Sequence, residues 1–480
     1  MGFLARTITA VKGMFKNGQP MHTETSNLMK AKKKLWRQVY QNQSPWLKPG
    51  KVWSANLAAI ASAEVARLVT LDLKARVNGD EAVAETFIRE AVWDVRNQVE
   101  YGLALGGFIL KPYLCGDSVR VAFLLPLEFE IAETDTDGTV IDIFFMDYEP
   151  KHEKLRVERH VFDRRASAYL ITNEVYKNNG TIDGLGSKIP DTQAELRKVP
   201  RWADIAPGQE LRGITRPLFA CFKPATSNTV DIKSPHGVSL FDKALPLIRL
   251  ADEHLSGIVR EFRMKETRLY VSSFALDATK RRGERIPYLE DDLYVKFFAD
   301  DKQGTTFFEV FSPEIRHESF LQVFNKYQQM VEDNIGLMHG TFSAPDAGVS
   351  DRTATAIRES KHRTYSTVSS NQMALRKCLE GALYAVATYM GKDWRGQELV
   401  LEFDDTLIRD PREALTDMLD DVSMGLVKPE IYLAKKYAVS KEDALKMMPQ
   451  GTQLLRDNRT ALIWNQAELT ADTAGDGSTE

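Results

Sequence analysis

Residues 312–391 have the sequence SPEIRHESFLQVFNKYQQMVEDNIGLMHGTFSAPDAGVSDRTATAIRESKHRTYSTVSSNQMALRKCLEGALYAVATYMG. The first part predicts a helix, because Ser312 is a good N-cap and Pro313 suits the first helical position. Apolar residues then recur every three to five positions, so one face of this helix is expected to be buried. These residues are Ile315, Phe320, Phe324, Tyr327, Val331 and Ile335.

A loop and a second, longer helix are expected to follow. The helical pattern fades at Gly336, and residues 340–349 contain glycine and proline in a pattern that favours a loop. Ser350 and Asp351 can cap the next helix, which has no proline and a single glycine before Met390. Such a helix would be about 60 Å long at roughly 1.5 Å per residue.

The composition of this second helix changes along its length. Residues 352–372 are polar nearly all round, whereas Leu375, Leu379, Leu383 and Val386 form an ordinary apolar stripe. A helix that is polar all round either lies on the surface of a monomer or packs in a wet interface between subunits. Its length and its position beside a loop favour the second interpretation.

The composition of the whole chain excludes several classes of protein. The 480 residues are 43% hydrophobic and carry a formal net charge of -4, as expected of folded soluble domains that do not bind DNA by charge alone. The three cysteines are an odd number without close spacing, which argues against a disulfide framework. The sequence contains no apolar run of about 18 residues, the length that would predict a membrane helix. The amphipathic arm of residues 1–27 is interpreted as a docking segment.

The rest of the chain is expected to alternate between helical and strand-like blocks. Helices are predicted over residues 57–73, 80–105 and 240–262, the last kinked or restarted at Pro246. An α/β insertion at 267–311 lies between two helices, which must therefore form a hairpin. An antiparallel meander is predicted from the strands 108–114, 119–125, 140–148, 155–162 and 168–176, with further strands at 217–224 and 398–403 and late helices at 411–423, 428–437 and 440–448.

Motifs for common enzyme chemistry are absent from the sequence. It contains no phosphate-binding loop of the GxxxxGK[ST] type, no GxSxG elbow and no HExxH helix. No catalytic residue, cofactor site or metal site is therefore assigned. One alternative stays open, a magnesium-dependent nuclease built on acidic residues. Its candidate ligands are Glu402, Asp404 and Asp405, or Asp135 and Asp137.

Three segments, together with the order of the elements, resemble a known family. YGLALGGFILKPY at residues 101–113 resembles a helix-to-strand segment of the portal proteins of long-tailed bacteriophages. TATAIRES at 353–360 resembles the start of the long portal helix, and EFDD at 402–405 resembles the strand that follows it. The resemblance covers about residues 28–430.

The resemblance implies an α+β, elongated, multidomain subunit. It would have an N-terminal arm (1–27), a wing (28–236), two stem helices (237–266 and 312–338) around a clip (267–311), and a tunnel loop (339–350). A long wing and core helix with a late strand (351–410), crown helices (411–467) and a disordered tail (468–480) would complete it.

The family also implies a function. Such proteins form rings, commonly dodecamers, at one vertex of the capsid in the virion, and they assemble in the host cytoplasm. They pass double-stranded DNA and bind the terminase large subunit, the major capsid and scaffolding proteins, and the head-completion and tail adaptor proteins. A capsid-associated scaffold that forms no ring remains the other alternative.

The resemblance assigns residues to each role. The tunnel loop would present Thr341, Phe342, Ser343, Asp346 and Val349 to DNA, and Ser343 and Ala347 would be the places to test with lysine. The subunit interface would include Arg352, Arg358, Glu359 and His362. The clip would dock partners through Lys280, Arg281, Arg282, Arg285, Glu290, Asp291 and Asp292.

Overall fold

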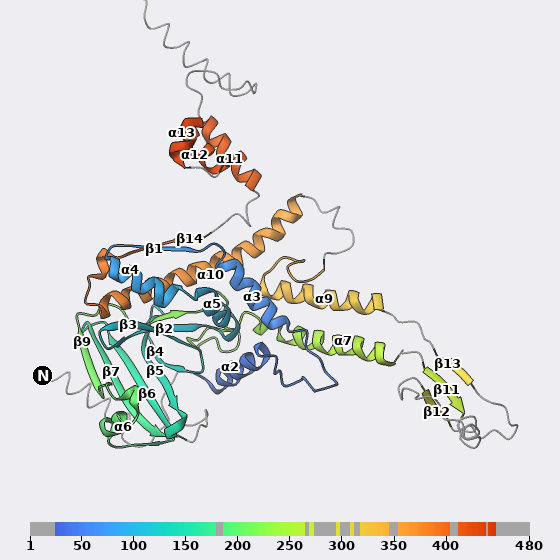
Figure 1. Cartoon of the computed structure of the whole chain (residues 1–480), viewed down its shortest axis with the longest axis horizontal. Helices are drawn as coiled ribbons and strands as arrows, with labels where there is room; N and C mark the ends of the chain where they lie inside the picture. Colours follow the sequence, from blue (N-terminus) through green and yellow to red (C-terminus); the bar gives the residue numbers. More distant parts are fainter. Residues whose placement is uncertain are drawn as a thin grey trace, which may run out of the picture. The chain divides into compact units, whose positions relative to one another are not determined.

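The structure is a computed structural model. It describes residues 25–178, 186–264, 268–272, 294–297, 308–311, 317–344, 354–403, 411–437 and 440–447. The chain divides into two compact units, residues 1–403 and residues 404–480. Helices and strands alternate along the first unit, which confirms the α+β prediction (Figure 1). No described helix is long and apolar enough to cross a membrane.

The first unit contains most of the expected blocks together with short strands and a helix that were not predicted. Its main helices are α2 (Asn27–Tyr40), α3 (Leu57–Val69), α4 (Glu81–Phe87), α5 (Val95–Leu105), α6 (Thr192–Lys198), α7 (Leu245–Met264), α9 (His317–Ile335) and α10 (Ala354–Tyr389). Its strands are β1 (Lys74–Asn78), β2 (Phe108–Cys115), β3 (Ser118–Leu124), β4 (Phe129–Thr134), β5 (Val140–Glu149), β6 (Lys154–Asp163), β7 (Ala168–Lys177), β8 (Ser187–Lys188), β9 (Gly208–Arg212), β10 (Ala220–Phe222), β11 (Arg268–Ser272), β12 (Tyr294–Phe297), β13 (Phe308–Phe311) and β14 (Glu398–Glu402).

The expected single meander is wrong, because the strands form two sheets. One sheet has the order β10-β2-β3, and the other has the order β4-β5-β6-β7-β8 with β9 also paired to β7. The break follows β3, where Pro126 lacks a backbone N–H for a ladder. The Glu128 carboxylate accepts a hydrogen bond from Leu125 N at 2.7 Å and shapes the turn. The next strand, β4, therefore begins a separate sheet.

The helix expected over residues 80–105 is also interrupted. A π-helical turn (Ile88–Val92) separates α4 from α5. The apolar row Val83, Phe87, Ala91, Val95 and Val99 explains it, because a spacing of four drifts by about 40° per step on a helix of 3.6 residues per turn. A wider turn offsets that drift and keeps the whole row buried.

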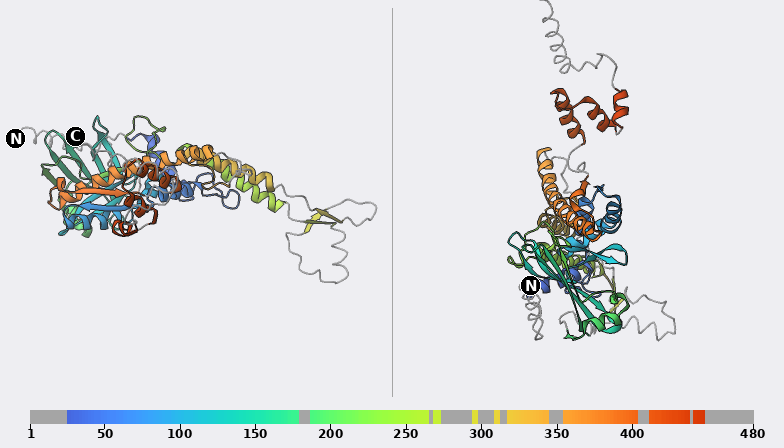
Figure 2. Two further views of the ribbon diagram at one scale, coloured as in Figure 1. Left: turned by 90° about the horizontal axis from the view of Figure 1, so that it is seen from above. Right: turned by 90° about the vertical axis from the view of Figure 1, so that its left-hand side faces the viewer.

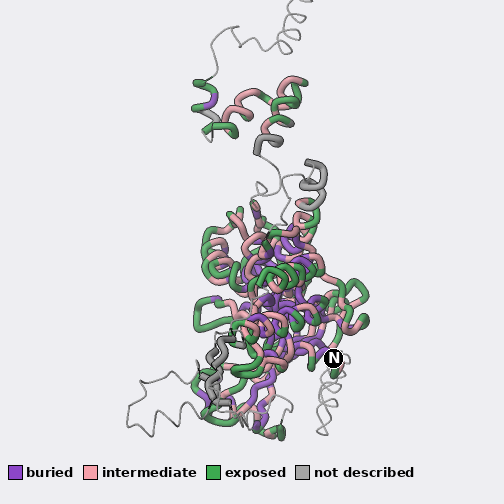
Figure 3. The backbone as a smooth tube through the Cα atoms, turned by 90° about the vertical axis from the view of Figure 1, so that its right-hand side faces the viewer, coloured by how far each residue is buried: buried purple, intermediate pink, exposed green. Residues whose placement is uncertain are grey.

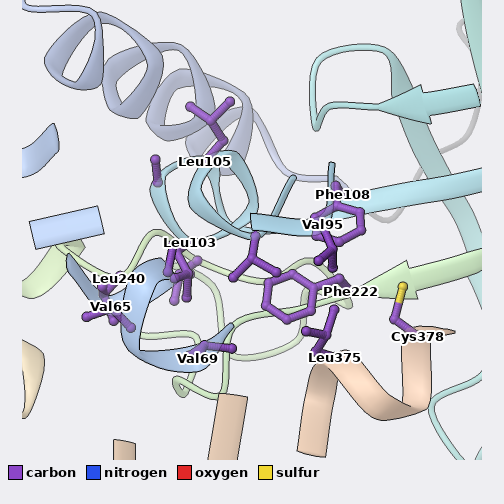
Figure 4. Packing of buried hydrophobic residues seen from close by; sticks show 14 of the residues in the cluster. Val65, Val69, Val95, Leu103, Leu105, Phe108, Phe222, Leu240, Leu375 and Cys378 are labelled. Atoms are coloured by element: carbon purple, nitrogen blue, oxygen red, sulfur yellow. The ribbon is translucent and has the colours of Figure 1, made fainter. Parts of the chain in front are cut away.

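The largest core surrounds the second half of α10. Leu375, Leu379 and Val386 are fully buried there, which confirms the apolar stripe. They belong to one cluster with residues of α3, α5, β2 and β10, and Figure 4 shows part of it, including Phe108 and Phe222. The far end of α10 is fixed by Tyr384, whose hydroxyl lies 3.0 Å from Thr215 N as a hydrogen-bond acceptor.

Helices α7 and α9 form the expected hairpin. They lie side by side in both views of the first unit (Figures 1 and 2). His254 of α7 joins them, because its Nε2 lies 2.9 Å from the carbonyl oxygen of Phe320. Pro246 falls in the first turn of α7, where proline is tolerated, so the helix restarts there as expected. Between the two helices, β11 pairs parallel to β12 and antiparallel to β13.

A buried ionic cluster joins Lys111 of the smaller sheet to residues of β6 in the larger sheet. Glu158 Oε2 lies 2.6 Å from Lys111 Nζ and 3.0 Å from Arg156 Nη1, and Glu158 Oε1 contacts His160 Nε2 at 2.7 Å. Burial by itself would raise the pKa of Glu158, but Lys111, His160 and Arg156 together hold that pKa well below its ordinary value. Burial lowers the pKa of His160, so we treat it as neutral. The cluster is therefore charge-paired, as a buried group must be.

Three short helices lie in the described part of the second unit. They are α11 (Pro411–Ser423), α12 (Pro429–Tyr437) and α13 (Lys441–Met447), each within one residue of the expected bounds. The helices predicted after the late strand are thus confirmed, while the expected N-terminal arm up to residue 24 and the tail at 468–480 lie outside the described residues.

One glycine of the family-like segment can be tested directly. Alanine normally stabilises a helix interior by about 1 kcal/mol relative to glycine. At Gly102 of α5, however, a Cβ would lie 2.6 Å from Phe108 and 2.8 Å from Phe222. We therefore expect Gly102→Ala to lower the free energy of unfolding by about 1–3 kcal/mol through overpacking. Urea denaturation followed by circular dichroism measures this change.

Gly396→Ala is the control, because a Cβ at Gly396 meets no atom within 4 Å. A Gly102→Ala protein that is as stable as the wild type, or more stable, would show that the two aromatic rings do not restrict this position.

Candidate functional site

The loop that follows α9 is held by hydrogen bonds from side chains of both α9 and α10. Helix α9 ends at Ile335, and Gly336 has a φ of 86°, a conformation that favours glycine. The amides of Gly336 and Leu337 both donate to the carbonyl oxygen of Glu332 at 2.9 Å. The chain therefore turns sharply at Gly336, and residues 336–344 fold back along α9.

The carboxylate of Glu332 holds this loop together. Its side chain is buried with 0% exposure and accepts four hydrogen bonds from the loop. Phe342 N and Ser343 N donate to Oε1 at 2.7 and 2.9 Å, while Gly340 N and Ser343 Oγ donate to Oε2 at 3.2 and 2.8 Å. A buried charge is costly unless it is hydrogen-bonded, so these donors stabilise the carboxylate and the carboxylate orders the loop.

Two further side chains of α9 bind the end of the loop. Asn325 contacts Ala344 twice, because its Oδ1 accepts from Ala344 N at 2.7 Å and its Nδ2 donates to Ala344 O at 3.1 Å. Gln328 Nε2 donates to Phe342 O at 3.2 Å. The loop is thus attached to α9 at both oxygen and nitrogen atoms of its backbone.

Helix α10 binds the start of the same loop. Thr364 Oγ1 accepts a hydrogen bond from Met338 N at 2.8 Å, and Thr367 Oγ1 donates to Gly336 O at 2.9 Å. Arg363 contacts Asp333 of α9, with 2.7 Å between Nη1 and Oδ1. Part of the polar half of α10 therefore serves contacts within the subunit, which the sequence interpretation assigned to an interface between subunits.

Two amide side chains farther along α10 also make contacts within the subunit. Asn371 Oδ1 accepts from Ala225 N at 3.1 Å, and Gln372 Nε2 donates to Val69 O at 3.4 Å. Both residues are buried. Polar residues at these positions satisfy backbone groups that would otherwise be buried without a partner.

The structure places some of the residues predicted to line the loop. Thr341 is half-buried and donates to Met338 O at 2.6 Å, and Phe342 packs partly buried against the main core. Ser343 is buried against Glu332, so its hydroxyl is not presented as a neutral polar group to a channel. Gly340 and Ala344 are the exposed residues in the described part of the loop. Asp346, Ala347 and Val349 lie outside the described residues.

Most of the other predicted positions cannot be placed. The clip residues Lys280, Arg281, Arg282, Arg285, Glu290, Asp291 and Asp292 lie outside the described residues, as does Arg352. Arg358 and Glu359 belong to α10, but their side chains are not described. His362 is exposed, with its ring centroid 6.4 Å from that of Tyr365.

The acidic residues of the nuclease alternative have other partners or lie apart. Asp135 and Asp137 lie in a turn and form ion pairs with Arg164, with 3.0 Å from Asp135 Oδ2 to Nη1 and 2.7 Å from Asp137 Oδ2 to Nη2. The hydrogen bond from Arg164 lowers the pKa of Asp137. Glu402 is exposed on β14, and Asp404 and Asp405 are outside the described residues. Within the described part of the chain, no group of three or more histidine, cysteine, aspartate or glutamate residues is placed to hold a metal ion.

A small cavity near α2 is a second place where polar groups meet. Its volume is about 10 Å³, room for roughly one water molecule, and Lys33 and His236 line it. Burial lowers the pKa of Lys33 to about 8, although Glu130 nearby opposes the shift. Glu130 Oε2 lies 3.8 Å from Lys33 Nζ. The cavity is too small for a cofactor, so the loop after α9 remains the candidate site.

Sequence interpretation placed the loop but missed the residues that hold it. Glu332 and Asn325 lie beside the apolar row of α9, at positions where a charged or amide side chain usually faces solvent. The sequence feature that could have indicated this contact is Glu332, which lies one turn before Gly336, where the helix ends. The loop that follows is rich in small residues, whose backbone amides can donate to a carboxylate.

Comparison with known proteins gives one family match. The family model described as "Phage portal protein, SPP1 Gp6-like" matches residues 69–451. No curated protein sequence matches the chain. Among solved structures, a chain from "Neck of native GTA particle computed with C12 symmetry" aligns with a TM-score of 0.41 and 10% identity, and the alignment covers 94% of this chain and 100% of that chain.

The role of Glu332 can be tested by substitution. Glu332→Ala leaves the amides of Phe342 and Ser343 without their acceptor, whereas the Gly340 amide keeps Ser343 Oγ at 2.9 Å. We expect a loss of about 1–3 kcal/mol in unfolding free energy and at least tenfold faster hydrogen exchange at the Phe342 and Ser343 amides. Glu318→Ala, on an exposed position of the same helix, serves as the control. Unchanged exchange in Glu332→Ala would mean that another contact orders the loop.

Proposed function

The chain belongs to the SPP1 Gp6-like family of phage portal proteins, and we propose on this premise that it forms the ring through which double-stranded DNA enters and leaves a phage capsid. The ring would stand at one capsid vertex in the virion and would assemble in the host cytoplasm. We propose twelve subunits. The role is structural, and ATP hydrolysis would belong to the terminase that docks on the ring.

The observation that supports a ring most directly is the exposed apolar surface of the stem helices. On α9, Leu321, Val323 and Met330 are 54%, 43% and 38% exposed. On α7, Leu250 and Phe262 are 44% and 46% exposed. Helix α7 and helix α9 already pack against each other, so these side chains need another partner. The neighbouring subunit's stem supplies a helix of matching length.

The loop after α9 supports the role as a passage for DNA. A segment that contacts moving DNA should hold its shape without binding phosphate tightly. The Glu332, Asn325 and Thr364 contacts provide the first property. Weak phosphate binding follows from the absence of any lysine or arginine between residues 337 and 351 and from the net charge of -4 on the chain.

Partner docking is proposed for the clip and the surrounding surfaces. The charged segment 280–292 follows the first clip strand, β11, and combines four basic with three acidic side chains from the set named above. We propose that it contacts the terminase large subunit and, after packaging, the head-completion and tail adaptor proteins. The major capsid and scaffolding proteins would contact the wing. No observation on the described residues favours the nuclease alternative or a scaffold that forms no ring.

The ring can be tested at the stem. Leu321→Glu places a charge on an exposed apolar position, so the monomer should keep its stability to within about 0.5 kcal/mol. In the ring the same charge would be buried between subunits, and we expect at least tenfold weaker assembly. Mass photometry over a range of concentrations gives the fraction of rings.

The control is Ile232→Glu, a similar change at a position that is 90% exposed on a loop of the wing. Rings of wild-type stability from Leu321→Glu, or a wild-type protein that stays monomeric, would contradict the stem interface.

The loop can be tested with an added positive charge. The structure directs the test to Ala344, because lysine at buried Ser343 would break its bonds to Glu332. Ala344→Lys should add a phosphate contact in each subunit, steepening the salt dependence of DNA binding by about one unit per phosphate. We expect slower packaging in vitro that recovers as salt rises, and no slowing for Ala344→Gln. Equal rates for both variants at low salt would place this loop away from DNA.

A further inference from the structure

The described helices of the second unit bury almost none of their side chains. Among the described residues of α11–α13, Ala444 is the one classed as buried (Figure 3). Large apolar side chains are exposed on every helix and on the turn between the first two. They are Leu419, Met424, Leu426, Ile431, Tyr437, Leu445 and Met447, with Leu426 74% and Met424 72% exposed.

The three helices span only residues 411–447, a stretch too short to bury a core by itself. Below about 40 residues a domain usually needs disulfides, a metal or association to remain folded. The described residues of this unit contain no cysteine and no metal-binding cluster. Large apolar side chains exposed on all three helices indicate an interaction site, so association is the remaining means of stabilisation.

The charges of the unit indicate what covers it. On α11, Asp420 and Asp421 are exposed, and their carboxylates have no cation within 4 Å in the described part of the chain. On α12, Lys435 and Lys436 are exposed, and Lys436 stacks on Tyr432 and Tyr437 at 5.4 and 5.5 Å. An acidic helix end and a basic helix end, neither ion-paired among the described residues of one copy, complement each other between two copies.

We propose that the α11–α13 unit completes its core only in the assembled ring, by packing α11 of one subunit against α12 of the next. This inference rests on the proposed ring. Exposed apolar residues would form a shared core, and Asp420 and Asp421 of one copy would pair with Lys435 and Lys436 of its neighbour. The contact is head-to-tail, because different helices meet, and head-to-tail contacts close into rings. The unit would thus order at the moment of assembly.

Hydrogen exchange on the full-length chain tests the ordering. Amides of α12 should be at least tenfold more protected in the ring than in dissociated monomer, while amides of α10 change little. Leu426→Gln should remove most of that gain and leave rings intact by electron microscopy, since the stem holds them. Ile232→Gln, also highly exposed, is the control. Equal protection of α12 in ring and monomer would overturn the proposal.

Charge reversal tests the neighbour directly. Rings of Asp420→Lys/Asp421→Lys, or of Lys435→Glu/Lys436→Glu, should lose α12 protection at least tenfold. Rings assembled from an equal mixture of the two variants should regain it wherever the variants alternate, because opposite charges then meet at every contact between neighbours. Failure of the mixture to regain protection would overturn the proposal, since contacts within one copy cannot respond to mixing.

Truncation after Met447 shows whether the chain's own C-terminal segment, rather than a neighbouring subunit, covers the apolar surface of α11–α13. The segment 448–480 contains apolar residues, among them Leu462, Ile463 and Trp464, that could cover the same surface. Protection of α12 that persists in rings of the truncated chain supports the shared core, and protection lost on truncation contradicts it. The presence of rings is scored separately by electron microscopy, so a protein that forms no rings refutes the proposed function rather than this contact alone.

Discussion

The buried carboxylate of Glu332 is the constraint on which the candidate site depends. A carboxylate removed from water must be satisfied by hydrogen bonds, and in the described structure the donors come from the loop itself, from Gly340, Phe342 and Ser343. The loop can therefore take only conformations that bring these amides to one point. Glu332 lies on α9, so the position of the stem helix and the position of the loop are coupled.

Helix α10 extends this coupling across the first unit. Near its start, Thr364 and Thr367 bind the loop, and near its end Tyr384 accepts a hydrogen bond from Thr215 beside the strands. The apolar stripe between these ends lies in the largest core. A single helix of 36 residues thus joins the loop to the strands, and a displacement of one end has to be accommodated at the other.

Much of this architecture could be predicted from the sequence, because local patterns encode it. The change from helical to alternating spacing at Phe108 and the apolar stripe from Leu375 both follow from periodicity. The π turn could have been anticipated only from the four-residue spacing of Val83, Phe87 and Ala91.

What the sequence could not show are side-chain contacts between distant segments. Ser343 looks like a free hydroxyl in a loop, yet it is bound to a glutamate eleven positions earlier. Thr367 and Asn371 look like surface residues, yet they satisfy backbone groups of Gly336 and Ala225. β3 and β4 belong to different sheets. The alternation of apolar and polar residues predicts a strand, but it does not specify which neighbouring strand it pairs with.

The central claim is that the subunits form a ring whose passage is bordered by the loop after α9. An electron cryomicroscopy reconstruction of the purified wild-type protein tests it most directly. The account predicts a closed ring in which Gly340 and Ala344 of every subunit face the central opening, with Glu332 still bound to the loop. A protein without closed rings, or a ring with this loop on its outer surface, would contradict it.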